Sequence, residues 1–414
     1  CICEALPAGL TFTEESAVLG LIAPRAIKIC SGLRDANAAF HPQEMLKSFH
    51  GAKAVYGIYG ADDNLSYQIF NTPHGYFPEM REAMLGWFDL HLKREGTGAP
   101  KKEKQFTPLP ASVLMVFSNG QRPSEVVSTG DYCFNKGSRL RSGMLSDESM
   151  DMIEKKDALK QMLKISDNYE LKDIHQLSDS NDWERYILET TTGDLIPLLI
   201  YLPNKISREY VLIANSKGKN GVKALLIDEL VTKGAGICIV DLWGIGENAS
   251  PEATRIDGSL PEFHTLSRSV LWLGQTMQGI WAGQLEIVVN WLINSHHVKK
   301  ITIDADKELA VASVLSSVLG NKVNRLILRE MPLSYLFDKS GDVNHFSMAI
   351  HIPGFLLWGD MSLAVAMSGK DITFIDPVTI SGRELSVKET DDFRKEFYHF
   401  RSLSGERSEV SFVK

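Results

Sequence analysis

The chain has 414 residues, of which 44% are apolar and 23% charged, and its formal net charge is −8. These values are typical of a globular protein with a sizeable core, built as one large domain or as two or three smaller ones. The negative charge argues against nucleic acid or an anionic membrane as a partner, because phosphate binding requires concentrated lysine and arginine. No run reaches the about 18 consecutive apolar residues that a membrane-spanning helix needs, so we expect no membrane partner.

The five cysteines are odd in number and scattered along the chain, which excludes a disulfide framework and a zinc knuckle. They are Cys1, Cys3, Cys30, Cys133 and Cys238. The sequence begins at Cys1 without a methionine, and its first residues are typical of a domain interior. We therefore expect a processed or truncated product, whose cellular compartment cannot be read from its N-terminus.

In the first segment, two short apolar runs at 26–31 and 53–59 predict buried strands of a parallel sheet. Residues 41–51 between them predict a crossover helix that ends at a glycine. Residues 77–95 repeat apolar side chains in steps of three and four, which predicts an amphipathic helix. Residues 1–95 thus form a first module.

Residues 96–182 predict a linker and connecting helices, one of them at 150–165. From 183 the pattern changes to a strand hairpin followed by strand-like runs that alternate with helix-like segments. The runs are 209–221, 234–248, 299–306, 323–331 and 370–378. Repeated strand–helix units predict an α/β fold with a mostly parallel sheet flanked by helices, here assigned to a domain of residues 183–414.

Asp35 follows the first predicted strand and His74 follows the next one. Open α/β sheets place their sites beyond the carboxyl ends of neighbouring parallel strands, so the two side chains are expected to meet there. An acid followed by a histidine is also the order of the last two triad members in α/β-hydrolases. Asp62 and Asp63 remain alternatives for the acid.

The surrounding residues resemble the C-terminal third of secreted bacterial α/β-hydrolase esterases of the acetyl xylan esterase type. The resemblance rests on "APRA" at 23–26, "SGLRD" at 31–35 and the histidine in "HGYFPEM" at 74–80. It implies Asp35 as the triad acid and His74 as the general base. It also implies an acylated polysaccharide or small ester as substrate and an extracytoplasmic location, with no cofactor.

The nucleophile that these two residues should serve is missing from the first module. A G-x-S-x-G elbow is expected upstream of the acid, and no such pattern occurs before Asp35. Ser16 and Ser31 lack the flanking glycines. We therefore predict a nucleophilic serine on a segment outside this chain. The two strands are expected to pack on that segment, on another chain or on residues 183–414, because a two-stranded sheet leaves an edge and an apolar face open.

Residues 183–414 resemble a diverged second copy of the same fold. The elbow is expected after 299–303, where the chain reads Asp304-Ala305-Asp306-Lys307-Glu308 and the nucleophile position aligns with Asp306. The loop 215–221 takes the place that often supplies oxyanion amides in hydrolases. A downstream histidine in a comparable context is absent, because His399 is the only histidine after residues 373–385. These changes predict a degenerate domain.

Other patterns carry weaker signals. Residues 243–248 lack the third glycine of a dinucleotide fingerprint, and the adjacent His296 and His297 point in different directions on a helix, so no cofactor or metal is expected. Two hypotheses remain for the whole chain. One is part of a serine carbohydrate esterase that deacylates plant polysaccharide; the other is a non-catalytic pseudo-hydrolase that binds carbohydrate or acts as a scaffold.

Overall fold

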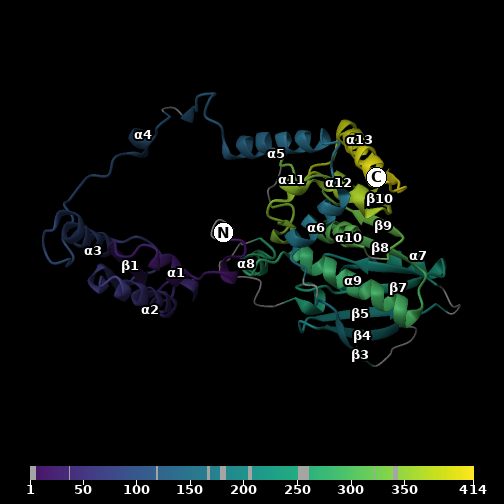
Figure 1. The fold of residues 1–414 in the computed structure, drawn as a ribbon, viewed down its shortest axis with the longest axis horizontal. Helices are drawn as coiled ribbons and strands as arrows, with labels where there is room; N and C mark the ends of the chain where they lie inside the picture. Colours follow the sequence, from purple (N-terminus) through teal and green to yellow (C-terminus); the bar gives the residue numbers. More distant parts are fainter. Residues whose placement is uncertain are drawn as a thin grey trace. The chain divides into compact units, whose positions relative to one another are not determined.

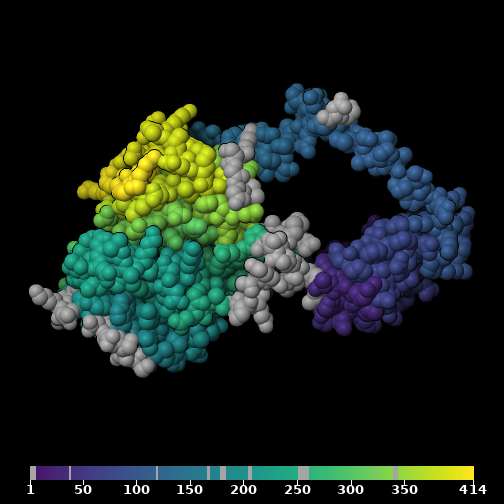
Figure 2. All heavy atoms as spheres, turned by 180° about the vertical axis from the view of Figure 1, so that it is seen from behind, coloured from purple at the N-terminus to yellow at the C-terminus, as the bar shows by residue number. Residues whose placement is uncertain are grey.

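The computed structural model describes most of the chain. The chain divides into two compact units (Figures 1 and 2). The small unit is Gly9–Val126, and the described residues of the large unit lie within Cys1–Ala8, Val127–Thr254 and Ser259–Lys414. The described residues are 6–36, 38–117, 120–165, 168–177, 183–203, 208–249, 261–320, 322–338 and 344–414. Cys1 and Cys3 lie outside them, and Cys30, Cys133 and Cys238 are free thiols.

The small unit is built around two parallel strands, β1 (Ile27–Gly32) and β2 (Leu65–Phe70), paired from Ile27 with Leu65 to Gly32 with Phe70. Helix α2 (Pro42–Ile58) packs on one face through Phe49, Ala52 and Tyr56. Helix α3 (Pro78–Phe88) packs on the other face, where Met80 and Ala83 contact Phe70. Two further helices are α1 (Glu15–Gly20) and α4 (Ala111–Leu114), and a π-helical turn, Asp89–Lys93, extends α3.

The predicted strand at 53–59 is wrong, because α2 continues through it to Ile58. Phe49, Ala52 and Tyr56 are spaced by three and four residues and are all buried against the sheet. That helical stripe stabilises the longer helix, and Gly51 is accommodated within it. The second strand is instead β2, and the first was predicted to within one residue of its position.

The large unit contains a nine-stranded sheet in the order β11-β10-β9-β8-β6-β7-β5-β4-β3 (Figure 1). Its strands are β3 (Leu171–Gln176), β4 (Trp183–Thr190), β5 (Leu195–Tyr201), β6 (Glu209–Ala214), β7 (Gly236–Val240), β8 (Lys300–Asp306), β9 (Arg325–Arg329), β10 (Asp371–Ile375) and β11 (Val410–Val413). All strand pairs on the β11 side of β7 are parallel, namely β7–β6, β6–β8, β8–β9, β9–β10 and β10–β11. The pairs β3–β4, β4–β5 and β5–β7 are antiparallel. The sheet is therefore mixed, and the expectation of a mostly parallel sheet is not confirmed.

Helices cover both faces of this sheet. The main core lies under α9, α10, α12 and α13, and a smaller cluster around Ile213, Ile237 and Ile239 lies under α7. The helices are α5 (Thr129–Leu145), α6 (Met152–Leu163), α7 (Ala224–Thr232), α8 (His264–Trp272), α9 (Met277–His296), α10 (Lys307–Leu319), α11 (Phe355–Trp358), α12 (Met361–Ser368) and α13 (Val387–Ser404). The predicted hairpin and the five later strand-like runs are all confirmed as β4 to β10.

Among the described residues, no single helix is long and apolar enough to cross a membrane. One bent pair, 348–358 with 361–368, meets the length and composition criteria when its two parts are taken together.

Candidate functional site

The structure brings Asp35 and His74 into direct contact. The carboxylate oxygen Oδ2 of Asp35 lies 2.8 Å from Nδ1 of His74. An ionised carboxylate can only accept a hydrogen bond, so Nδ1 carries the proton and Nε2 of the neutral ring is the acceptor. The Asp35 side chain is only 7% exposed, whereas that of His74 is 71% exposed. The pair thus consists of a buried acid that orients an imidazole facing outward.

The two loops that carry this pair are held together by their backbones. The amide of Leu33 donates to the carbonyl of Phe70 (2.7 Å), and the amide of Arg34 donates to that of Thr72 (3.0 Å). Gly32 permits this approach, since a Cβ there would lie 2.9 Å from the carbonyl oxygen of Thr72. The parallel register of β1 and β2 therefore extends into the turns and fixes the acid against the base.

Asp62 and Asp63, the alternative acids, do not contact His74. They lie in the short 3₁₀ helix η4 (Asp62–Asn64), immediately before β2, and both are exposed. His74 follows the carboxyl end of the same strand. The strand separates these carboxylates from the histidine, and Asp35 is the acid that the fold places beside it.

A cavity of about 350 Å³ surrounds the acid–base pair. Two serines line it, but both hydroxyls are engaged elsewhere: Ser31 donates to the carbonyl of Phe40 (3.3 Å) and Ser48 to Glu15 (3.4 Å). The hydroxyl of Ser16 donates to Glu14. No hydrogen bond from a serine to His74 occurs among the residues that the structure describes, so none of these hydroxyls is placed to be activated.

The large unit has its own cavity at the switch point of its sheet. From β6 the chain crosses to β7 on one side and later to β8 on the other, and open α/β sheets bind ligands where strand order reverses in this way. The loop after β6 and the turn from β8 into α10 both line this cavity.

The turn into α10 has the strained geometry of a nucleophile elbow, but its left-handed residue is Lys307, with φ of +48°. A non-glycine residue there costs about 1–2 kcal/mol. The alignment that put Asp306 at the nucleophile position is therefore off by one residue, because β8 runs on to Asp306 before the turn. In the order of a G-x-S-x-G elbow, Lys307 therefore occupies the position of the serine.

Asp306 instead forms hydrogen bonds with the loop 215–221, which was expected to supply oxyanion amides. Its carboxylate accepts hydrogen bonds from the backbone amide of Ser216 (2.6 Å), from the Ser216 hydroxyl (3.0 Å) and from Asn215 (3.3 Å). Burial raises the pKa of Asp306, although the hydrogen bonds from Ser216 act in the opposite direction. The Ser216 amide is thus already occupied by an internal anion.

A second buried acid, which the sequence analysis did not single out, orders the same loop. Asp241, 1% exposed, accepts from the amide of Lys219 (2.7 Å), from its ammonium group (2.6 Å) and from the amide of Glu247 (2.9 Å). The only signal in the sequence is its position directly after a buried strand, β7.

The other histidines considered in the sequence, His296 and His399, lie away from both cavities. His296 packs edge-on against Trp291 and Tyr186, and burial lowers its pKa. His399 lies on α13 and is not among the residues that line the large unit's cavity. Within the described part of the chain, one group of potential metal-binding side chains is Asp173, His175 and Glu189, where Glu189 is already paired with Lys172.

No protein-family model matches the chain, and no curated protein matches it either. Solved structures do. A protein from Bacteroides fragilis, proposed to be an acetyl xylan esterase, has a TM-score of 0.52 at 14% identity over 72% of this chain and 84% of its own.

Two further structures give lower scores. Acetyl xylan esterase 1 from Thermoanaerobacterium sp. has a TM-score of 0.38 at 13% identity, over 64% of this chain and 86% of its own. A glucuronoyl esterase from Solibacter usitatus has a TM-score of 0.39 at 12% identity, over 62% of this chain and 87% of its own.

At these identities the likeness concerns the fold. Together with the helix-flanked sheet, it places the chain in the α/β-hydrolase-like class. The resemblance drawn from the sequence therefore extends to the fold of the Bacteroides fragilis protein.

Proposed function

We propose that the chain is part of a serine carbohydrate esterase, similar to acetyl xylan esterases, that removes acyl groups from plant polysaccharide. Residues 1–95 would be the C-terminal part of its hydrolase domain, 96–182 a connection, and 183–414 a degenerate second copy. The observation that carries the proposal is the hydrogen bond from His74 Nδ1 to the buried Asp35, which leaves Nε2 directed outward.

In the proposed reaction, His74 Nε2 takes the proton of a serine hydroxyl as the serine oxygen attacks the ester carbonyl. The Asp35 carboxylate stabilises the imidazolium that forms. His74 then donates this proton to the departing sugar hydroxyl as the bond from the acyl carbon breaks. Water, activated by the same Nε2, releases the acyl group and regenerates the serine.

The serine would reach His74 from an element that pairs with the open side of β1. Among the described residues β1 pairs with β2 alone, and a two-stranded sheet is marginal without further strands. A parallel strand added there would end at the same edge as Asp35 and His74, where a strand-to-helix elbow could present its hydroxyl. We therefore assign the nucleophile to a segment outside this chain.

Hydrolysis of p-nitrophenyl acetate tests this proposal. The chain alone should be inactive, and the protein with its preceding segment restored should be active. His74→Ala in the restored protein should reduce kcat by at least about 10³-fold, within the range for loss of a general base.

His50→Ala is the matched control, because His50 is exposed on α2. An inactive restored protein, or a His74→Ala variant as active as the control, would overturn the assignment.

A second candidate function has its own support. Lys307 at the elbow and the capture of the Ser216 amide by Asp306 both disfavour ester hydrolysis by the large unit. The large unit fits a pseudo-hydrolase that binds a ligand, and this role is compatible with an active site in the small unit.

A further inference from the structure

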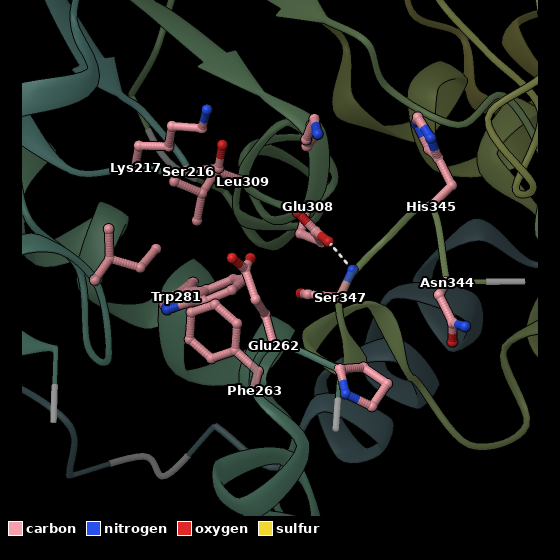
Figure 3. Close-up of a pocket in the computed structure, with 13 residues that line it drawn as sticks. Ser216, Lys217, Glu262, Phe263, Trp281, Glu308, Leu309, Asn344, His345 and Ser347 are labelled. Carbon is pink, nitrogen blue, oxygen red and sulfur yellow. Dashed lines mark hydrogen bonds between the residues drawn. The ribbon is translucent and has the colours of Figure 1, made fainter. Parts of the chain in front are cut away.

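The large unit's cavity has the dimensions and position of a ligand site. Its volume is about 490 Å³, within the range of small-molecule pockets. Six separate parts of the chain line it: the loop after β6, Ile245 after β7, the segment before α8, Trp281 of α9, the head of α10, and residues 344–347. Figure 3 shows the lining side chains around one space. Elements distant in sequence thus combine their polar groups at the switch point.

Two residues that line this cavity have a strained, left-handed backbone. Lys307 has φ of +48° and Phe263 has φ of +60°, and both line it. Three of the other left-handed non-glycine residues, Arg94, Lys164 and His297, are helix C-caps, where this conformation is common. The remaining three do not line the cavity: Ala8, Glu330 and Asp376. Neither Lys307 nor Phe263 ends a helix; each immediately precedes or begins one. Strain of this kind persists mainly where a site requires it.

The charges that line the cavity are balanced. Lys217 and Lys307 contribute two ammonium groups, and neither side chain has a hydrogen-bond or ion-pair partner among the described residues. Glu262 and Glu308 contribute two carboxylates. Glu308 is 5% exposed and accepts from the amide of Ser347, whereas the Glu262 carboxylate points into the space (Figure 3).

Paired cations and anions without net charge suit an uncharged ligand with many hydroxyl groups. A hydroxyl donates to a carboxylate and accepts from an ammonium group, so one ligand can satisfy both kinds of side chain. A carboxylate ligand would be repelled by Glu262, and a purely apolar ligand would leave all four charges desolvated. The aromatic ring of Phe263, held edge-on against Trp281 at 5.5 Å, offers an apolar surface for the C–H face of a sugar ring.

We propose that this cavity binds an uncharged saccharide, with Lys217 and Lys307 as donors to its oxygens and Glu262 as acceptor from its hydroxyls. The proposal rests on the pseudo-hydrolase function of the large unit, and it names the site and the ligand class. The bound sugar is not hydrolysed, because the elbow offers an ammonium group in place of a hydroxyl.

Isothermal titration calorimetry of the whole chain with xylotriose tests the proposal. We expect saturable binding with a Kd below about 1 mM, which corresponds to about −4 kcal/mol. Glucuronic acid at the same concentrations should bind at least ten-fold more weakly. Lys307→Met and Glu262→Gln should each weaken xylotriose binding at least ten-fold. Lys233→Met, at an exposed lysine that pairs with Glu229, is the matched control and should leave it unchanged.

Lys307→Gly separates binding from folding. Glycine relieves the left-handed strain, so this variant should unfold at no lower temperature and still lose at least ten-fold in affinity. The proposal is overturned if xylotriose gives no binding heat, if glucuronic acid binds as tightly, or if the Lys307 variants bind like the control. Asp35→Asn must not alter this binding, so a failure here is distinguishable from a failure of the esterase assignment.

Discussion

The small unit and the large unit differ in both their candidate site and their scaffold. The small unit has an acid and a base in hydrogen-bond contact, and among its described residues they are supported by two strands and a small cluster of buried side chains. The large unit has a nine-stranded sheet, an extended core and a strained elbow, but the elbow carries a lysine. A close acid–base contact and a large folded scaffold thus occur in different units. The contact depends on two turns, and the scaffold depends on the buried surface of a whole sheet.

The largest expected effect concerns the acid of the small unit. In the protein with its preceding segment restored, Asp35→Asn should lower kcat for p-nitrophenyl acetate by about 10⁴-fold, because an amide no longer fixes the Nδ1–H tautomer of His74. Asp62→Asn, at an exposed acid before the same strand β2, is the control and should change kcat less than two-fold. A loss below ten-fold for Asp35→Asn would mean that the contact is structural.

The scaffold of the large unit is expected to depend on a buried ion pair. Arg141 lies 3.1 Å from Asp360, which is 1% exposed and whose pKa is raised by burial. Arg141→Met leaves that carboxylate unpaired and should reduce the free energy of unfolding by about 3–5 kcal/mol. Urea unfolding followed by tryptophan fluorescence reports on it, since Trp87 alone of the 7 tryptophans lies in the small unit.

The control for this change is Arg394→Met at an exposed ion pair, expected to cost under about 1 kcal/mol. If both variants unfold alike, the buried network does not stabilise the large unit.

The turns of the small unit should be sensitive to a single added methyl group. Gly32→Ala would place a Cβ 2.9 Å from the Thr72 carbonyl and 3.0 Å from that of Pro73, so the acid and histidine loops must separate. We expect a loss of about 1–3 kcal/mol in unfolding free energy, together with lower esterase activity in the restored protein. Gly57→Ala, where the nearest atom is 3.8 Å away within α2, should instead be neutral or stabilising.

The smallest effect is a dependence on pH in the large unit. The Arg383 guanidinium beside Glu389 lowers the pKa of that carboxyl from 4.5 to about 2. A depressed folded-state pKa means that the stabilisation is present above pH 4.5 and is lost as pH falls through about 2. The pair is 39% exposed on both sides, so we expect under about 1 kcal/mol. Glu389→Gln should remove this part of the acid sensitivity in urea titrations between about pH 5 and about pH 2.

The sequence predicted the contact of Asp35 with His74 because it depends on chain order alone. Two parallel strands that end at the same edge bring the residues after them together, whatever the exact start of each strand. The second strand was predicted about a dozen residues too early, at 53–59 in place of 65–70, yet His74 follows both ranges. Asp62 and Asp63 could be judged only once β2 was located, since that strand places them at its opposite end.

The position of the elbow in the large unit could not be predicted from the amino-acid sequence. Its usual marker is a pair of glycines, and here Ala305 and Leu309 take their places, so nothing distinguishes the turn from the strand before it. The hydrogen bond from the Ser216 amide to Asp306 joins residues that are 90 positions apart, so no local sequence pattern predicts it. Periodicity likewise failed at 53–59, where a short apolar run fits a strand or a buried helix turn equally well.

The outward-facing ring nitrogen of His74 has a practical consequence. An imidazole with one nitrogen held by a carboxylate and the other open to solvent is accessible to acylating reagents such as diethyl pyrocarbonate. Its rate of modification can therefore be followed as a chemical footprint. An element that docks beside β1 and brings a serine to Nε2 would shield this one atom and slow its modification. The modification rate would therefore report when the active site assembles, without any substrate.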